Sequence, residues 1–513
     1  MLHSRPHFFH TILQHNKNTK KRNPAERPST PDFCLFFVIH LPLDNIFKVQ
    51  FISTSIHSLK RIGMFRFIGL IAAVLFFYGC QSQSSDSQSS PHSPSSPSAP
   101  VNESRPLIVI RINYDNVQFQ NDAYTWSKKI FGYSEHELNH YYQEISSGHF
   151  KFIKAYENEG TANDGIITVK LDKNHPDSGS EPTIHPDFFQ ALTKADSFIN
   201  YNLYDKNGDG NITPDELIIM FLIAGNEDAF TGLTNDLGVW AHQSCTLSAN
   251  TPLLDNVSLI GCAFGGKYAV FGERHHFGNY DADATIGIIA HELGHAAFGL
   301  PDLYDTSGQS AGIGYFGLMA GGMWAQEDPN DLFGNTPVHM SAWSKIHNHW
   351  IIADTVSDSS LQQVELTQTS SANYNVIKLP INSHEYFLLE NRNPSGYDKG
   401  LFSLNGTFNG GLAIWHIDQD VIDRYAASNQ VNANKSHKGV DLEEANKAEI
   451  DYDQNAFGHA DNLYYYGNKA NFTPLTSPNS NSYDRSSSGV GVANISYPGE
   501  TMSAVVTNPN REF

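Results

Sequence analysis

The segment 291–295, His-Glu-Leu-Gly-His, restricts the possible fold of this chain more than any other feature. His291 and His295 are four residues apart, so a helix would place both imidazoles on one face, about one turn apart. Two neutral imidazole nitrogens about 2.0–2.1 Å from a shared ion are typical of zinc. Glu292 follows the first histidine, where its carboxylate can take a proton from a metal-activated water. The segment therefore predicts a helix with two zinc ligands, His291 and His295, and a general base, Glu292.

The residues on both sides favour an active-site helix over a chance occurrence of this pattern. Thr285–Ala290 is apolar, as expected of a buried helix, and Gly299 is suited to end the helix because glycine accepts left-handed geometry. Pro301 prevents the helix from resuming. Asp302 comes next and offers a carboxylate where a third zinc ligand is expected.

Several segments, one of which includes this helix, follow one another in a recognisable order along the chain. They are Tyr141–Gly148, Asp205–Glu216, His291–Asp305, Gly317–Gly322, Tyr386–Asn393 and Gly411–Asp418. Together they resemble the immune inhibitor A-like secreted bacterial metallopeptidases, a family related to the metzincins, over roughly residues 105 to 508. The resemblance implies a zinc endopeptidase acting on proteins or peptides, with both histidines and an aspartate as ligands. It also implies a Met-turn at Met319, under the metal.

The spacing after the second histidine departs from the usual family pattern. That pattern has glycine three residues after the histidine and the acidic ligand three residues further on. Here Ala296–Phe298 precede Gly299, which is one residue more. Asp302 is therefore displaced in sequence, and Asp305 is the alternative third ligand. We favour Asp302 because it lies just after the expected end of the helix.

The acidic segment 205–216 matches the twelve-residue EF-hand calcium loop. The expected oxygen donors are Asp205, Asn207, Asp209, Asn211, Thr213 and Glu216. Gly210 permits the sharp turn that such a loop requires. The apolar stretch 217–224 that follows is typical of a buried strand, not of a second helix, so we expect a lone structural calcium site. The alternative is a solvated acidic turn.

The beginning of the chain predicts export. Residues 1–63 lack a periodic pattern and precede an export signal, so we interpret them as a mis-assigned N-terminal extension. Residues 64–79 have a positive start and a short apolar run, typical of a lipoprotein signal peptide with acylation at Cys80. Residues 80–104 are rich in Ser, Gln and Pro and predict a flexible tether. We expect a protein that is lipid-anchored at the bacterial cell envelope, on the outer membrane of a Gram-negative host; an ordinary secretory signal is the alternative.

Charge and cysteine content narrow the function classes. The formal net charge of −21 opposes binding to nucleic acid and suits an exported, calcium-binding protein. Cys245 and Cys262 lie close in sequence and can form a disulfide in an oxidising compartment. Two buried free thiols are the alternative.

The chain after the tether is long enough for two domains. Residues 105–355 mix strand-like and helical stretches, which predicts an α/β (α+β) fold. The resemblance implies that this is a metzincin-like zinc peptidase domain. Residues 356–513 contain short alternating runs separated by Gly, Asn, Ser and Pro, which predicts a β-rich C-terminal domain of the β-sandwich type.

These observations favour a zinc-dependent endopeptidase at the bacterial cell surface or outside the cell. One alternative is a surface-anchored, calcium-dependent binding or adhesion lipoprotein with a structural zinc. A structural zinc usually has four protein ligands, and Glu292 argues against it. The other alternative is a zinc hydrolase of a non-peptide amide. No specific protein partner is predicted.

Overall fold

The computed structural model describes residues 100, 102–177, 184–231, 237–247 and 251–510, and all of these fall in one compact unit. The segments 1–63 and 64–79, Cys80 and nearly all of the tether 80–104 lie outside the described residues. Within the described ranges, none of the helices combines the length and the apolar character that a membrane span requires. The chain has a mixed α/β fold with several sheets. The predicted domain boundary at 355–356 stays a prediction.

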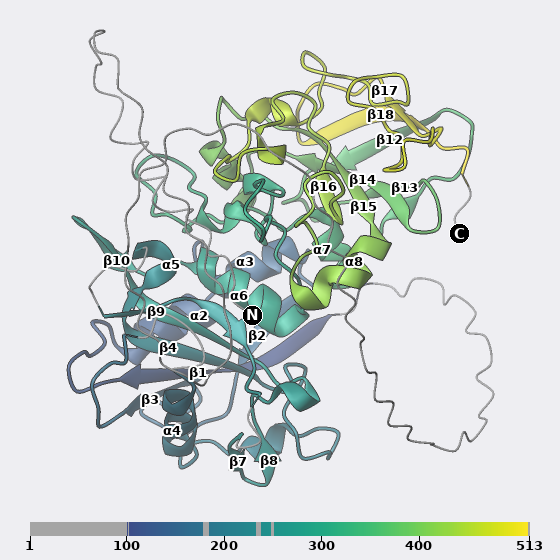
Figure 1. The fold of residues 1–513 in the computed structure, drawn as a ribbon. Coiled ribbons are helices and arrows are strands. Elements are labelled where there is room, and N and C mark those ends of the chain that lie inside the picture. Colours follow the sequence, from purple (N-terminus) through teal and green to yellow (C-terminus); the bar gives the residue numbers. More distant parts are fainter. Residues whose placement is uncertain (1–99, 101, 178–183, 232–236, 248–250, 511–513) are drawn as a thin grey trace, which may run out of the picture. The chain divides into compact units, whose positions relative to one another are not determined.

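The largest sheet has eight strands and occupies the first part of the fold (Figure 1). Its strands are β1 (Glu103–Asn113), β2 (Phe150–Lys154), β3 (Ile166–Lys170), β4 (Ile218–Glu227), β5 (Gly238–Val239), β6 (His242–Ser244), β9 (Tyr268–Phe277) and β10 (Tyr280–Asp283). The main path runs β10-β9-β4-β1-β2, and β3, β5 and β6 pair with β1, β4 and β9. β1, β4 and β9 run parallel, whereas β6 and β10 pair with β9 in the antiparallel direction. A small hairpin of β7 (Leu253–Leu254) and β8 (Val257–Ser258) stands apart from this sheet.

Helices cover both faces of the large sheet. The α-helices are α2 (Ala123–Phe131), α3 (Leu138–Ile145), α4 (His185–Ala195), α5 (Asp228–Thr231), α6 (Ile286–Phe298), α7 (Ala342–His347) and α8 (Gln419–Tyr425). Alternate residues of β1 enter two different cores: Leu107 packs with α2, α3 and α6, while Ile108 packs with α4. This alternation follows from the two-residue period of a strand. It places α6, the helix of the His-Glu-x-x-His segment, on one face of the sheet, and α4 lies on the other (Figure 1).

Short 3₁₀ helices connect many of these elements. They are Tyr201–Tyr204, Cys262–Phe264, Gly314–Phe316, Gly321–Trp324, Gly396–Ser403, Ala426–Ser428, Glu449–Asp451 and Ala460–Asn462. The segment predicted as a strand after the acidic loop forms β4 as expected.

Two further sheets lie in the C-terminal part. One has the order β11 (Asp354–Thr355), β13 (Ile377–Pro380), β14 (Glu385–Arg392), β15 (Gly411–Asp418) and β16 (Val440–Leu442). The other has the order β12 (Gln362–Thr367), β18 (Thr501–Thr507) and β17 (Gly491–Ala493). Leu389 of β14 and Met502 of β18 belong to one hydrophobic core, so the two sheets share apolar side chains.

The opposite face of β14 and β15 packs into the core that surrounds α6. Leu388 and Trp415 from these strands belong to the same buried cluster as Leu293 of α6. The C-terminal sheet therefore supports the helix with the candidate site.

Candidate metal centre

Helix α6 is buried along almost its whole length, as its apolar start predicts. Gly299 caps its C-terminus at φ 68°, and the N–H of Gly299 donates to the carbonyl of His295 at 2.9 Å. The predicted helix end at Gly299 is confirmed. Gly294 is required for close packing, because a Cβ there would lie 2.6 Å from the Met319 sulfur. Met319 thus packs against the helix between the two histidines.

Three side chains converge at the end of α6. His291 Nε2 and His295 Nε2 are 3.2 Å apart, and each lies 3.1 Å from Asp302 Oδ1. All three residues are buried. Ligand atoms about 2.0–2.1 Å from a tetrahedral zinc lie roughly 3.4 Å from one another. The donor set of two imidazoles and one carboxylate, at this spacing, fits zinc.

Main-chain carbonyls orient both imidazoles. His291 Nδ1 lies 3.0 Å from the carbonyl oxygen of Leu318, and His295 Nδ1 lies 2.5 Å from that of Leu300. Since a carbonyl only accepts, each Nδ1 carries the proton and each Nε2 presents its lone pair to the common point. Burial alone would raise the pKa of Asp302, but protons on the Nε2 atoms of His295 and His291 would lower it well below its ordinary value when no ion is bound, and zinc would take the place of those protons.

Glu292 is buried beside this cluster. Burial raises the pKa of its carboxyl to about 7, and Asp302 adds to the shift; His291 and a hydrogen bond from the main chain of Gln243 oppose it. Gln243 belongs to β6, an outer strand paired with β9. The carboxylate of Glu292 is therefore held between the histidines and the sheet.

Asp305, the alternative third ligand, points elsewhere. Its Oδ1 accepts from the N–H and hydroxyl of Ser307, at 2.7 and 2.6 Å. Its Oδ2 accepts from the N–H of Gln309 and the hydroxyl of Ser310. These contacts close a turn, and of the two aspartates only Asp302 joins the histidines.

Two residues other than the histidines, Asn429 and Tyr304, form hydrogen bonds with Asp302. Its Oδ2 accepts from the side-chain amide of Asn429 at 2.5 Å, and its N–H donates to Asn429 Oδ1 at 2.7 Å. Tyr304 also forms a side-chain hydrogen bond with Asp302, and its ring lies 6.5 Å from that of His291. Asn429 follows Asp302 by 127 residues, so no local motif indicates the contact.

The acidic loop 205–216 folds as a tight turn with its carboxylates toward the main chain. Asp205 accepts from the N–H groups of Gly208 and Gly210, at 2.8 and 2.9 Å. Glu216 closes the loop by accepting from the N–H groups of Thr213 and Lys206. In the described ranges, the compact groups of three or more His, Cys, Asp or Glu ligand atoms are found elsewhere.

One such group is the histidine–aspartate cluster at α6, and the second lies at the ends of β14 and β15. The second group consists of His384, Glu385 and Asp418. Its carboxylates already have partners, since Glu385 pairs with His416 at 3.1 Å and Asp418 with His437 at 2.7 Å. It is a network of partly buried histidine–carboxylate contacts.

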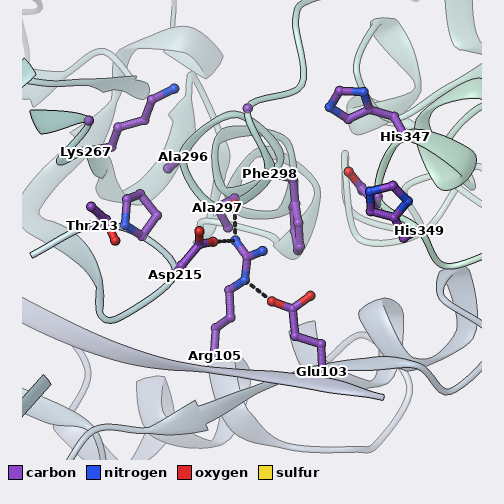
Figure 2. Close-up of a pocket in the computed structure, with 14 residues that line it drawn as sticks. Glu103, Arg105, Thr213, Asp215, Lys267, Ala296, Ala297, Phe298, His347 and His349 are labelled. Atoms are coloured by element: carbon purple, nitrogen blue, oxygen red, sulfur yellow. Dashed lines mark hydrogen bonds and ion pairs between the residues drawn. The ribbon is translucent and has the colours of Figure 1, made fainter. Parts of the chain in front are cut away.

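A pocket of about 560 Å³ lies behind the last turn of α6 (Figure 2). It is lined by Glu103, Arg105, Thr213–Asp215, Gly265, Lys267, Ala296–Gly299 and His347–His349. Arg105 crosses it, donating to the carbonyl of Ala297 and pairing with Asp215 at 3.1 Å. The acidic loop is thereby connected to the helix that carries the histidines.

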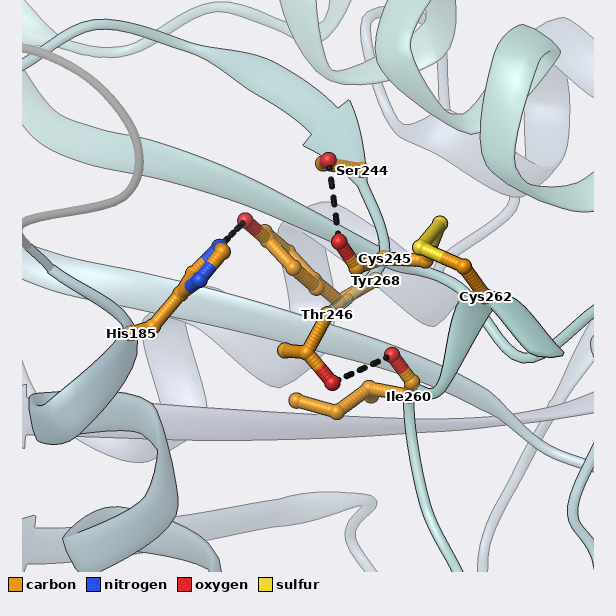
Figure 3. Close-up of a disulfide and its surroundings, with 7 residues drawn as sticks. All are labelled: His185, Ser244, Cys245, Thr246, Ile260, Cys262 and Tyr268. Carbon is orange, nitrogen blue, oxygen red and sulfur yellow. Dashed lines mark hydrogen bonds between the residues drawn. A yellow bond between two sulfur atoms is a disulfide. The ribbon is translucent and has the colours of Figure 1, made fainter. Parts of the chain in front are cut away.

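A disulfide joins Cys245 to Cys262, with a Cα–Cα distance of 5.0 Å (Figure 3). Next to it, the N–H of Thr246 donates to the carbonyl of Ile260 at 2.8 Å. The bridge follows β6, the strand whose Gln243 contacts Glu292.

Comparisons with known proteins relate part of this chain to one family. Residues 110–351 match the family model described as immune inhibitor A peptidase M6, catalytic domain. Two crystal structures of wild-type OgpA from Akkermansia muciniphila have 12% and 13% sequence identity and TM-scores of 0.26. Those matches cover 64% of this chain and 92% and 93% of the OgpA chains. No curated protein matches the chain.

Proposed function

Residues 110–351 of this chain are an immune inhibitor A-like metallopeptidase domain, and from this premise we propose that the protein is a zinc-dependent endopeptidase. Its substrates are proteins or peptides. The observation that carries the proposal is the triangle of His291 Nε2, His295 Nε2 and Asp302 Oδ1, with sides of 3.1–3.2 Å. These three atoms would hold the ion, and bound zinc would supply Lewis-acid activation of water and of the scissile carbonyl.

The protein's own groups orient the two imidazoles and transfer the proton. The carbonyls of Leu318 and Leu300 keep both Nε2 lone pairs directed at one point. As general base, the carboxylate of Glu292 accepts a proton from the attacking water and returns it to the leaving amine. The hydroxyl of Tyr304 donates a hydrogen bond to Asp302, because an ionised carboxylate can only accept.

The test of this proposal is Glu292→Gln, assayed on casein. The variant should retain one equivalent of zinc, because the carboxamide removes only the base. Its turnover should fall about 10²–10⁴-fold, the usual contribution of a general base. Glu365→Gln is the matched control, since it makes the same chemical change at an exposed position of β12, away from the histidines. Parental turnover in Glu292→Gln would contradict the assignment of the base.

We further propose that the loop 205–216 binds one structural calcium ion. The loop sequence and the left-handed Gly208 and Gly210, at φ 73° and 77°, support this. Main-chain N–H groups already direct Asp205 and Glu216 inward. The ligands would be the six donors expected from the sequence.

The finer fold and the location are also proposals. We propose a metzincin-like catalytic domain over 105–355, with Met319 as the Met-turn, and a β-sandwich over 356–513. The shared core of β14 and β18 supports the sandwich. The signal at 64–79 and Cys80 support export and lipid anchoring at the cell envelope.

The family match does not favour the adhesion or non-peptide alternatives. Digestion of a peptide library, with and without a chelator, separates all three. Chelator-sensitive peptide cleavage is expected here. A binding protein would leave the library intact, and an amidase would cleave only non-peptide amides.

A further inference from the structure

Asn429 contacts Asp302 at both its main chain and its carboxylate. The Asn429 amide donates to Oδ2 of Asp302, and its own side-chain oxygen accepts the N–H of Asp302. The other carboxylate oxygen, Oδ1, faces both histidines at 3.1 Å. Asn429 thus occupies one oxygen of the carboxylate and leaves the other for the shared point.

The backbone of Asn429 is built for this contact. It follows the 3₁₀ turn Ala426–Ser428 with φ 56°, a left-handed conformation that asparagine adopts more readily than most other residues. Its carbonyl accepts from the hydroxyl of Thr306 at 3.0 Å. The side chain and the main-chain carbonyl of Asn429 therefore both form hydrogen bonds with the segment that carries Asp302.

Neighbouring residues dock the same two segments along their length. The buried amide of Asn432 donates to the carbonyl of Leu303 at 2.9 Å, and the buried ammonium of Lys438 donates to that of Gly312 at 3.1 Å. The hydroxyl oxygen of Ser307 lies 3.2 Å from the carbonyl oxygen of Ala433. The segment 429–438 thus lies along 302–312 and restricts its movement.

We propose that Asn429 is a positioning residue for the third metal ligand, and that the site is completed by residues beyond the matched catalytic domain 110–351. This inference rests on the proposed zinc site. A free carboxylate can rotate or present both oxygens, and it must then lose that freedom when it binds the ion. The amide on Oδ2, together with the hydroxyl of Tyr304, restricts these alternatives in advance, so the affinity for zinc depends in part on Asn429.

Two variants test this without straining the backbone. Asn429→Gly keeps the left-handed conformation and deletes the amide. Asn429→Asp keeps the shape and the acceptor for the Asp302 N–H, but replaces the donor with a second carboxylate. Zinc affinity, measured by competition with a chelating dye, should fall about 10–100-fold in Asn429→Gly. It should fall further in Asn429→Asp because two carboxylates then repel.

Asn163→Gly is the matched control. Asn163 is exposed, has φ 62° and lies outside the site, so the same substitution should leave zinc affinity unchanged. Melting of the zinc-free proteins verifies that each variant is folded. If Asn429→Gly fails to fold, the zinc affinity of Asn429→Asp decides whether the proposal stands.

The outcomes separate this inference from the proposed function. If the parent binds one zinc, His295→Ala abolishes binding, and the folded Asn429 variants bind zinc as tightly as the parent, the positioning role is wrong and the zinc site stands. If His295→Ala binds zinc as the parent does, the zinc site itself is wrong.

Discussion

The guanidinium of Arg392 donates to the main-chain carbonyl of Phe316 at 2.7 Å, so the C-terminal sheet supports the chain just before Met319. Phe316 lies two residues before Leu318, whose carbonyl orients His291. Arg392 is fully buried and forms two hydrogen bonds with Asp398. The segment Tyr386–Asn393, which the resemblance to the family singled out, therefore has a structural role under the site.

Replacing Arg392 with methionine should destabilise the protein strongly. The carboxylate of Asp398 would stay buried without its cation, which costs about 3–5 kcal/mol. Glu390 would keep its ion pair with Lys345. Urea unfolding in the inactive Glu292→Gln background measures this without self-digestion. Arg424→Met, at an exposed position on α8, is the control and should change little. Equal midpoints for both variants would contradict the role assigned to Arg392.

Asp302→Asn and Asp305→Asn should affect different properties. Asp302→Asn removes the anionic oxygen beside the histidines, so zinc affinity and proteolysis should both collapse. Asp305→Asn weakens a closed turn, so it should lower the melting temperature while one zinc equivalent still binds. Metal content after dialysis, measured beside the melting curve, distinguishes the two. Loss of zinc from the folded Asp305→Asn variant alone would reverse the assignment.

His416 should make the free energy of unfolding depend on pH. Burial opposes its protonation, but hydrogen bonds to Glu385 and Glu443 prevail and raise its pKa to about 9. A raised histidine pKa gives stability that is complete below the unfolded pKa of about 6.5 and is lost as pH rises through 9. The loss should be on the order of 3 kcal/mol.

The measurement is urea unfolding between pH 6 and 10, in the Glu292→Gln background. His416→Gln should abolish the decline above pH 7 that the parent shows, whereas the exposed His349→Gln should retain it. A parental protein with constant stability across this range would show that His416 is not charged in the fold.

Removal of calcium should destabilise the fold more than it alters the chemistry. EGTA should lower the melting temperature of calcium-loaded protein, because the carboxylates of the loop, among them Asp205 and Glu216, would then lack their cation. Glu216→Gln should have a lower melting temperature than the parent even in calcium. Asp172→Asn, which removes an exposed ion pair with Lys194, is the control and should melt as the parent does. Melting of the loaded parent that EGTA does not change would exclude calcium from the loop.

The sequence alone predicted the elements whose information is local. The four-residue spacing of His291 and His295 dictates a common helix face, and the backbone freedom of Gly299 dictates where that helix ends. The apolar run after the acidic loop likewise predicted β4. These features depend on residues within a few turns of one another.

Tertiary structure decided what depends on distant residues. Asp302 and Asp305 are chemically alike in sequence, and only the turn closed by Ser307 and Ser310 directs Asp305 away from the histidines. Asn429 reaches Asp302 because packing of the C-terminal sheet brings segments 127 residues apart into contact. Hydrogen bonds formed across that distance have no periodicity or spacing in the chain, so a pattern of residues could not have revealed them.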